Sequence, residues 1–319
     1  MENSNATRTF KFNGNGGSLF GILFVNFVLT VLTLGLYYPW AKANRLKYIY
    51  QEAEFEGSSF SFHGTGAEIF KGMIKAIGIV ILLIIPYVLG LLSGNATALI
   101  AGTIVYVMGL VTLIPIAITG SLRYRLSRTS WKGIQFGYRG KSSDLLKIYA
   151  KGILFTIFTL GFYGAWLYMD LYRKVVENAR VGSLEFKFNG RGKEFLLMNI
   201  EGYFGTIFTL GIYYFWWKKN VHNYIFNNIE VIQDEERRGK LKSIVTGTDF
   251  LALSLSNLLL LVVSLGFAYP WVMIRTARFY MKNLAVLGTV DFDSIVQTER
   301  DYKDATGDSV LDAVDFQLI

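Results

Sequence analysis

The chain has 319 residues, of which 52% are hydrophobic, 16% aromatic and only 18% charged, and its formal net charge is +8. Soluble domains usually carry about 25% charged residues, so this composition, with its mean hydropathy of +0.35, predicts a membrane protein. The sequence contains no cysteine, which excludes disulfides, thiolate metal sites and cysteine catalysis. The basic residues are spread among the loops, a distribution that favours contact with acidic lipid headgroups over nucleic-acid binding.

The N-terminal segment, residues 1–17, is polar and lacks the apolar stretch of a cleavable signal peptide. Within it, Phe10-Lys-Phe12-Asn-Gly14 has the alternation of a short strand followed by a glycine turn. The pattern recurs as Phe60-Ser-Phe62-His-Gly64, Phe136-Gly-Tyr138-Arg-Gly140 and Phe186-Lys-Phe188-Asn-Gly190. A degenerate copy, Ile244-Val-Thr-Gly247, and a strand-like Thr289-Val-Asp-Phe-Asp293 complete the series.

The spacing of these strand patterns predicts internal repeats. The starts at 10 and 60 are 50 residues apart, as are those at 136 and 186, but 76 residues separate 60 from 136. The excess of 26 residues has the length of one additional membrane helix with its turn, which we place around Ser93-Gly94-Asn95.

Each strand pattern leads into an apolar run that begins near a residue suited to a helix N-terminus. These residues are Ser18, Glu68, Asp144, Glu194 and Asp249. Four runs end in a glycine, then tyrosine, then a tryptophan five residues after the glycine: Gly35 and Trp40, Gly161 and Trp166, Gly211 and Trp216, Gly266 and Trp271. This ending is typical of a helix that leaves the bilayer through an aromatic belt, so the four tryptophans are predicted interfacial anchors. The basic, aromatic segment after each one predicts a helix along the membrane surface.

Six membrane spans follow from these runs: residues 18–36, 70–92, 97–119, 144–162, 194–213 and 249–268. The predicted fold is mainly α, a polytopic helical membrane protein built from ~50-residue repeats with short β-strands outside the membrane. Residues 1–295 form one repeat-built membrane domain in this prediction, and residues 296–319 form an acidic, polar tail. An alternative stays open, because re-entrant single-span modules would place all basic loops on one side of the membrane, as the positive-inside rule favours.

The residues of the strand patterns, the Thr-Leu-Gly-x-Tyr-Tyr-x-Trp endings and the segment Tyr37-Tyr-Pro-Trp-Ala-Lys42 resemble the YjgN family of bacterial inner-membrane proteins. The resemblance covers roughly residues 8–295. It implies a multi-pass protein of the bacterial inner membrane, in a family catalogued as a domain of unknown function, so it carries over no functional residues. The second module departs from the pattern because it lacks the glycine–tryptophan ending, and the fifth because it has lost the aromatic strand.

Polar residues inside the predicted spans are the candidate site, because polar groups in hydrocarbon are costly and often functional. Lys151 and Glu201 each lie ten residues before such a glycine and carry opposite charges, so we expect them to pair near the bilayer midplane. The polar patch is completed by Asn26, Asn199, Ser256 and Asn257. Transporters place binding sites in such patches between repeats. The structural alternatives are an ion pair that only fixes packing, or a Lys151 side chain that extends to the membrane surface.

Three functions are compatible with the sequence. The repeats and the polar patch favour a transporter or channel for a small solute. The second possible function is a non-catalytic membrane scaffold or envelope partner protein. The third is an interfacial lipid-modifying enzyme. We expect no enzyme activity, cofactor or metal, because no catalytic motif is present and neither His63 nor His222 has a partner at ligand spacing. The expected partners are the lipid bilayer and, from the small residues on the helices, further copies of the chain.

Overall fold

The computed structural model of the protein describes residues 6–299, in which ten strands and ten helices follow one another. The strands are β1 (Ala6–Phe12), β2 (Ala53–Phe55), β3 (Ser58–Phe62), β4 (Thr129–Trp131), β5 (Ile134–Tyr138), β6 (Ala179–Val181), β7 (Leu184–Phe188), β8 (Ile229–Gln233), β9 (Glu236–Ser243) and β10 (Leu284–Gly288). The helices are α1 (Gly16–Leu32), α2 (Tyr38–Glu52), α3 (Gly66–Leu92), α4 (Ala96–Ser127), α5 (Ser142–Phe158), α6 (Gly164–Asn178), α7 (Gly192–Phe208), α8 (Tyr214–Asn227), α9 (Gly247–Val263) and α10 (Tyr269–Lys282).

The strands close into one antiparallel barrel in the order β1-β10-β9-β8-β7-β6-β5-β4-β3-β2. The ring closes because β1 pairs with β10 over its first half and with β2 over its second, so that Thr9 lies opposite Ala285 and Phe10 opposite Phe55. The predicted fold, a mainly helical polytopic protein, was therefore wrong. The strand patterns were recognised, but pairing between strands of distant repeats leaves no local signal in the sequence, so the barrel was missed.

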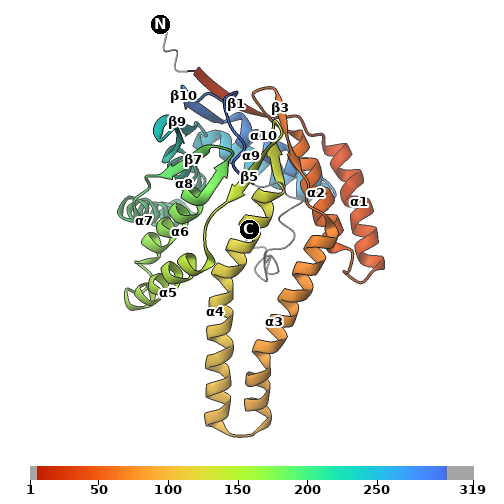
Figure 1. Cartoon of the computed structure of the whole chain (residues 1–319), viewed down its shortest axis with the longest axis vertical. Helices are drawn as coiled ribbons and strands as arrows, with labels where there is room; N and C mark the ends of the chain where they lie inside the picture. Colours follow the sequence, from red (N-terminus) through yellow and green to blue (C-terminus); the bar gives the residue numbers. More distant parts are fainter. Residues whose placement is uncertain (1–5, 300–319) are drawn as a thin grey trace.

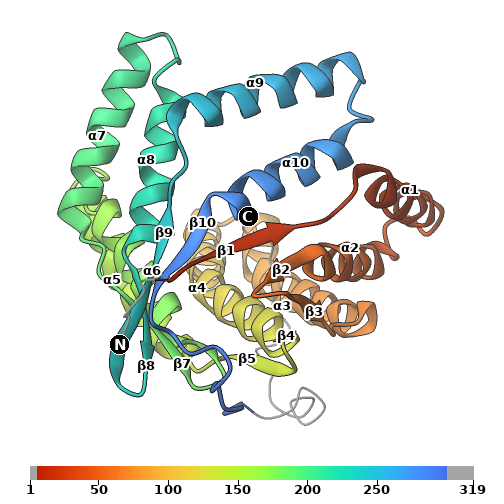
Figure 2. The same cartoon turned by 90° about the horizontal axis from the view of Figure 1, so that it is seen from above.

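The two ends of the barrel differ. At one end the chain passes from strand to strand through helical hairpins, α1–α2, α3–α4, α5–α6, α7–α8 and α9–α10, which spread outward around the barrel (Figures 1 and 2). At the other end the strands are joined by two-residue turns such as Glu56-Gly57 and Lys132-Gly133, where both residues have positive φ, as in type I′ turns. All the described helices therefore leave the barrel at the same end.

The four short hairpins reverse direction at turns of one sequence type, Thr-Leu-Gly or Ser-Leu-Gly. In the first, Leu34 and Gly35 have φ of 51° and 93°, and the Tyr37 amide donates a hydrogen bond to Thr33 Oγ1 at 3.0 Å. The glycines predicted to mark helices leaving the bilayer thus mark hairpin tips, and the predicted surface helices are the returning arms. The predicted spans 18–36, 144–162, 194–213 and 249–268 each correspond to one arm and its tip turn.

Among the helices of residues 6–299, α3 and α4 alone are both long and apolar enough to cross a membrane. Figure 1 shows their hairpin extending well beyond the others. Ala53 lies 37 residues after Gly16 in the first module, and Thr129 lies 63 residues after Gly66 in the second, a difference of 26. The predicted additional helix is therefore absent. Instead, α3 is 10 residues longer than α1 and α4 is 17 residues longer than α2, or about 15 and 25 Å.

The Phe-x-Phe patterns build the barrel interior. Because alternate residues of a strand share a face, both aromatic residues of each pattern point inward. The first of each pair lines the lumen: Phe10, Phe60, Phe136 and Phe186, with Leu241 at the corresponding place in β9. The predicted terminal strand 289–293 is not a strand; its Val290 and Phe292 instead pack into the far end of the barrel, against Trp131 and Val286.

The tryptophans join neighbouring hairpins. A Cβ added at Gly66, the first residue of α3, would overlap the Trp40 ring of α2, so only glycine fits there. The same relation holds between Trp166 and Gly192, Trp216 and Gly247, and Trp271 and Gly16. The last pair closes the ring of hairpins. Between α4 and α5 both partners are absent, since Ile116 stands 13 residues before β4, where the other modules have tryptophan, and α5 begins at Ser142.

Candidate functional site

Two of the predicted intramembrane residues, Asn26 and Asn257, are buried on the inner faces of separate hairpins. Asn26 of α1 is buried, donates to Ala41 O at 3.3 Å, and accepts from Asn44 Nδ2 at 3.3 Å, so it bonds α1 to its own returning arm. In the last hairpin, Asn257 Nδ2 donates to Thr276 Oγ1 at 3.2 Å. Each asparagine therefore joins the two arms of one hairpin instead of reaching a shared patch.

The remaining candidates are held in the same way. Arg275 donates to Ser256 Oγ at 2.7 Å across the α9–α10 hairpin, and Asn199 Nδ2 donates to the Phe195 carbonyl of its own helix at 2.6 Å. Glu201 accepts a hydrogen bond from the Tyr213 hydroxyl at 2.6 Å, across the tip of the α7–α8 hairpin.

The structure does not bring Lys151 and Glu201 together. Within residues 6–299 no ion pair or hydrogen bond joins them. The Lys151 ammonium instead lies 5.9 Å from the centroid of the Phe155 ring, one turn along α5. Lys151 and Glu201 hold equivalent positions in neighbouring modules, but in the described part of this fold each contacts only its own hairpin.

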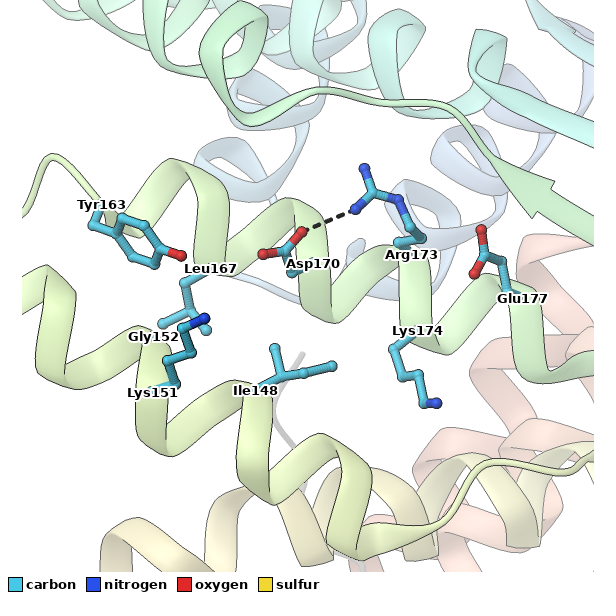
Figure 3. A pocket seen from close by; sticks show the side chains of 9 residues that line it. All are labelled: Ile148, Lys151, Gly152, Tyr163, Leu167, Asp170, Arg173, Lys174 and Glu177. Atoms are coloured by element: carbon cyan, nitrogen blue, oxygen red, sulfur yellow. Dashed lines mark hydrogen bonds and ion pairs between the residues drawn. The ribbon is translucent and has the colours of Figure 1, made fainter.

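Lys151 lines a polar cleft of about 250 Å³ between α5 and α6. Figure 3 shows it facing Tyr163 and Asp170, and Asp170 accepts from Arg173 at 2.9 Å. Toward the barrel, Lys174 pairs with Asp144 at 3.0 Å and its hydrogen bond holds the pKa of that carboxyl below its usual range. The ionic groups of this cleft thus largely neutralise one another, and the cleft is open along the surface of the hairpin.

The barrel lumen is the second candidate, and the sequence analysis missed it. An apolar cavity of about 200 Å³ lies among the lumen-facing side chains, and another of about 380 Å³ adjoins it at the helix end. Phe10, Phe60, Phe136 and Leu284 line both cavities. The alternating aromatic strands were the available signal, but only the closed pairing order shows that their inner faces enclose one space.

The histidines belong to the packing of the fold. His63 Nε2 lies 2.8 Å from Ser130 Oγ between β3 and β4. The His222 ring lies 4.6 Å from the rings of both Phe226 and Tyr280, and burial lowers its pKa to about 4. In the described part of the chain, no three His, Asp or Glu side chains gather as metal ligands would.

Comparison with known proteins identifies relatives. The sequence matches the family described as a bacterial protein of unknown function, DUF898, over residues 7–200 and 236–313. The protein of Salmonella typhimurium named Inner membrane protein YjgN is 33% identical over 137 residues, which are 42% of this chain and 32% of that protein. Its namesakes from Escherichia coli O157:H7 and K12 are 33% and 32% identical over 132 residues, 41% of this chain and 31% of each protein. These matches span less than a third of the length of those relatives, and no solved structure matches.

Proposed function

Because the chain belongs to the bacterial family DUF898, and its relatives are named inner membrane proteins, we propose that it is an inner-membrane protein inserted unequally into the two leaflets. The α3–α4 hairpin crosses the bilayer, the four short hairpins enter the leaflet beside the barrel, and the barrel stays in the cytoplasm. The protein is then a non-catalytic scaffold that acts on one face of the membrane.

The exposed leucine at each short tip carries this proposal. Leu34, Leu160, Leu210 and Leu265 are 95%, 90%, 96% and 87% exposed, and each adopts a positive φ. That conformation is unfavourable for any residue with a Cβ, and such exposure in water is costly for a leucine. In hydrocarbon the exposed leucine side chain is stabilised instead. The tip backbone also suits hydrocarbon, because groups such as Gly35 N, which donates to Thr30 O at 2.7 Å, bond within the turn.

The charged residues limit how deep a short hairpin can enter. The first charge after a tip glycine lies on the returning arm, at Lys42, Asp170, Lys218 or Arg275. These positions are four to six residues into their helices, or less than about 10 Å from the start of the returning helix. Half of the hydrocarbon layer is about 15 Å thick. A short hairpin therefore reaches no further than one leaflet before a charge would enter hydrocarbon.

The long hairpin has room to cross. No charged residue lies between Lys75 of α3 and Arg123 of α4. The two arms are about 15 and 25 Å longer than those of the first short hairpin. Within residues 6–299, every lysine and arginine lies on the barrel side of a tip, and by the positive-inside rule this distribution supports a cytoplasmic barrel.

The same geometry argues against solute transport. A transport route needs polar groups that line a path through the membrane, but the predicted polar residues, apart from Lys151, are hydrogen-bonded within their own hairpins or helices. At the insertion depth proposed above, these polar residues lie near the membrane surface and not at the bilayer midplane. Polar and charged groups such as Arg275, which donates to Ser256, are less costly there.

Single-cysteine labelling tests the insertion in this naturally cysteine-free chain. We would introduce Asn95→Cys at the long tip, Leu160→Cys and Leu265→Cys at short tips, and Lys132→Cys in a turn at the far end of the barrel. An impermeant maleimide should label position 95 from the periplasm only and position 132 from the cytoplasm only. Positions 160 and 265 should stay unlabelled from both sides until detergent is added.

Periplasmic labelling at position 160 or 265 would mean that the short hairpins cross the membrane, and would overturn the proposal. Rapid cytoplasmic labelling of both would mean that the tips are in water, with the same consequence.

A further inference from the structure

We propose that the barrel lumen binds a hydrocarbon chain, such as an acyl chain of a membrane lipid, which enters from the helix end. This inference rests on the proposed insertion, because the bilayer supplies the chain. It concerns a different part of the molecule, however, and can fail while the insertion holds.

The lumen is hollow for a geometric reason. An eight-stranded barrel is just wide enough for side chains to fill, and the diameter grows with strand number. Ten strands leave a space of about 200 Å³ here, even though Phe10, Phe60, Phe136 and Phe186 all project into it. Apolar cavities of about 150 Å³ stay dry and bind small hydrocarbons. An empty lumen would cost stability in proportion to its volume, and an apolar chain would recover that loss.

The far end of the barrel is sealed by the segment after β10. The Phe292 ring lies edge-on to Phe55 and Trp131, with centroids 5.0 and 5.9 Å away. The buried Gln233 side chain holds this segment in place, because it donates to Asp291 O and accepts from Asp291 N, each at 2.9 Å. A ligand therefore has no entry from the cytoplasmic end.

The helix end is where the larger cavity opens. It extends the lumen to the last turns of three returning arms, lined by Tyr50 of α2, Leu126 of α4 and Met281 of α10. This is the end of the barrel from which all five hairpins leave for the membrane (Figure 2). An opening among these arms connects the lumen to the proposed lipid side of the protein.

The lining selects the chemical class of ligand. All side chains that line the inner cavity are aromatic or aliphatic, and the one polar atom among them, Trp131 Nε1, donates to Phe55 O at 3.0 Å. The outer cavity adds only Tyr50 and Thr129 as polar residues. A charged headgroup would have no partner inside and must stay at the mouth. A peptide strand is excluded because the barrel closes on itself and offers no free edge.

The test uses the full chain in vesicles of phosphatidylethanolamine and phosphatidylglycerol, doped with a phospholipid that carries a diazirine near the end of one acyl chain. After illumination, adducts are mapped by mass spectrometry. We expect adducts on lumen residues such as Phe136 and on tip residues such as Leu160. Leu284→Trp should fill the lumen and lower the lumen adducts at least five-fold, with the tip adducts unchanged.

The matched control is Leu287→Trp, on the opposite face of β10, which should leave lumen labelling unchanged. If Leu284→Trp loses cooperative thermal unfolding, Val181→Phe fills the lumen from β6 and should give the same five-fold loss. Tip adducts without lumen adducts would overturn the lumen site alone. Lumen adducts that Leu284→Trp and Val181→Phe leave unchanged would also overturn it, and absence of adducts at both places would overturn the insertion and the site together.

Discussion

The long hairpin and the short hairpins leave the barrel and return to it in the same way, but their tips differ. Each short tip exposes a leucine at positive φ. The long tip is Ser93-Gly94-Asn95, where glycine takes the positive φ and Asn95 Oδ1 accepts from Thr97 N at 2.8 Å to cap α4. An apolar tip suits hydrocarbon and a polar, capped tip suits water. In the proposed insertion, the length of the uncharged part of the arms decides which solvent a tip meets, and the chemistry of the tip matches that solvent.

Shortening the long hairpin should have the largest effect. Deleting residues 82–92 and 97–107 removes eleven residues from each arm, which shortens it by about 16 Å and keeps the helix faces in phase, since eleven residues make about three turns. The polar tip would then stop inside the bilayer. Periplasmic maleimide labelling of an added Asn95→Cys should fall at least ten-fold.

The control for that deletion replaces the same residues by other apolar residues of equal number and should keep the labelling. Unchanged labelling of the shortened chain would show that the extra length of α3 and α4 is not what carries the tip across.

A charge at the tips should separate the two kinds of hairpin. Leu160→Asp places a carboxylate in hydrocarbon, which costs on the order of 3 kcal/mol, so we expect a marked loss of stability in vesicles. Asn95→Asp introduces the same side chain into water and preserves the helix cap, so we expect a change below about 0.5 kcal/mol. Urea unfolding in vesicles measures both, and equal losses would erase the distinction between the tips.

The ion pairs near the barrel ends of the hairpins should also differ in how much they stabilise the fold. In the long hairpin, Glu68 of α3 accepts from Arg128 at 3.0 Å, and the Arg128 side chain is only 7% exposed. Glu68→Gln leaves that guanidinium buried with a weaker partner, so we expect a loss of about 2 kcal/mol. In a short hairpin, Asp144→Asn breaks a more exposed pair with Lys174, and we expect a smaller loss.

The Asp144 pair also predicts a pH dependence. Because Lys174 lowers the folded pKa of Asp144, its contribution is complete above the unfolded carboxyl pKa of about 3.9. It is lost as pH falls through the lower folded value. Thermal unfolding of Asp144→Asn and the parent chain should therefore converge at acid pH. A difference that persists there would assign the effect to packing.

The sequence was sufficient for features that repeat locally. The Phe-x-Phe strands, the apolar arms that start near Ser18 or Glu194, and the turn at each glycine are encoded within a few residues. The direction in which the chain continues after that turn could not be predicted from the local sequence. Lys42 and Arg275 made the returning arms too polar to span, and a surface helix and a returning arm share that composition. The pairing of Lys151 with Glu201 failed for a related reason, since equivalent positions need not be neighbours once each hairpin bonds to itself.

The smallest expected effect isolates the strain at a short tip. At Leu34, with φ of 51°, replacement by alanine removes lipid contact and keeps the strain, whereas glycine removes both. Leu34→Gly should therefore be more stable in vesicles than Leu34→Ala by about 1 kcal/mol. At the neighbouring Leu36, which has no positive φ, alanine should be the more stable by up to about 1 kcal/mol, because glycine loses more entropy on folding. Thermal unfolding of the four variants in vesicles measures these differences. If glycine were more stable than alanine at both positions, or alanine more stable than glycine at both, backbone strain would not distinguish the short tips from the long tip at Gly94.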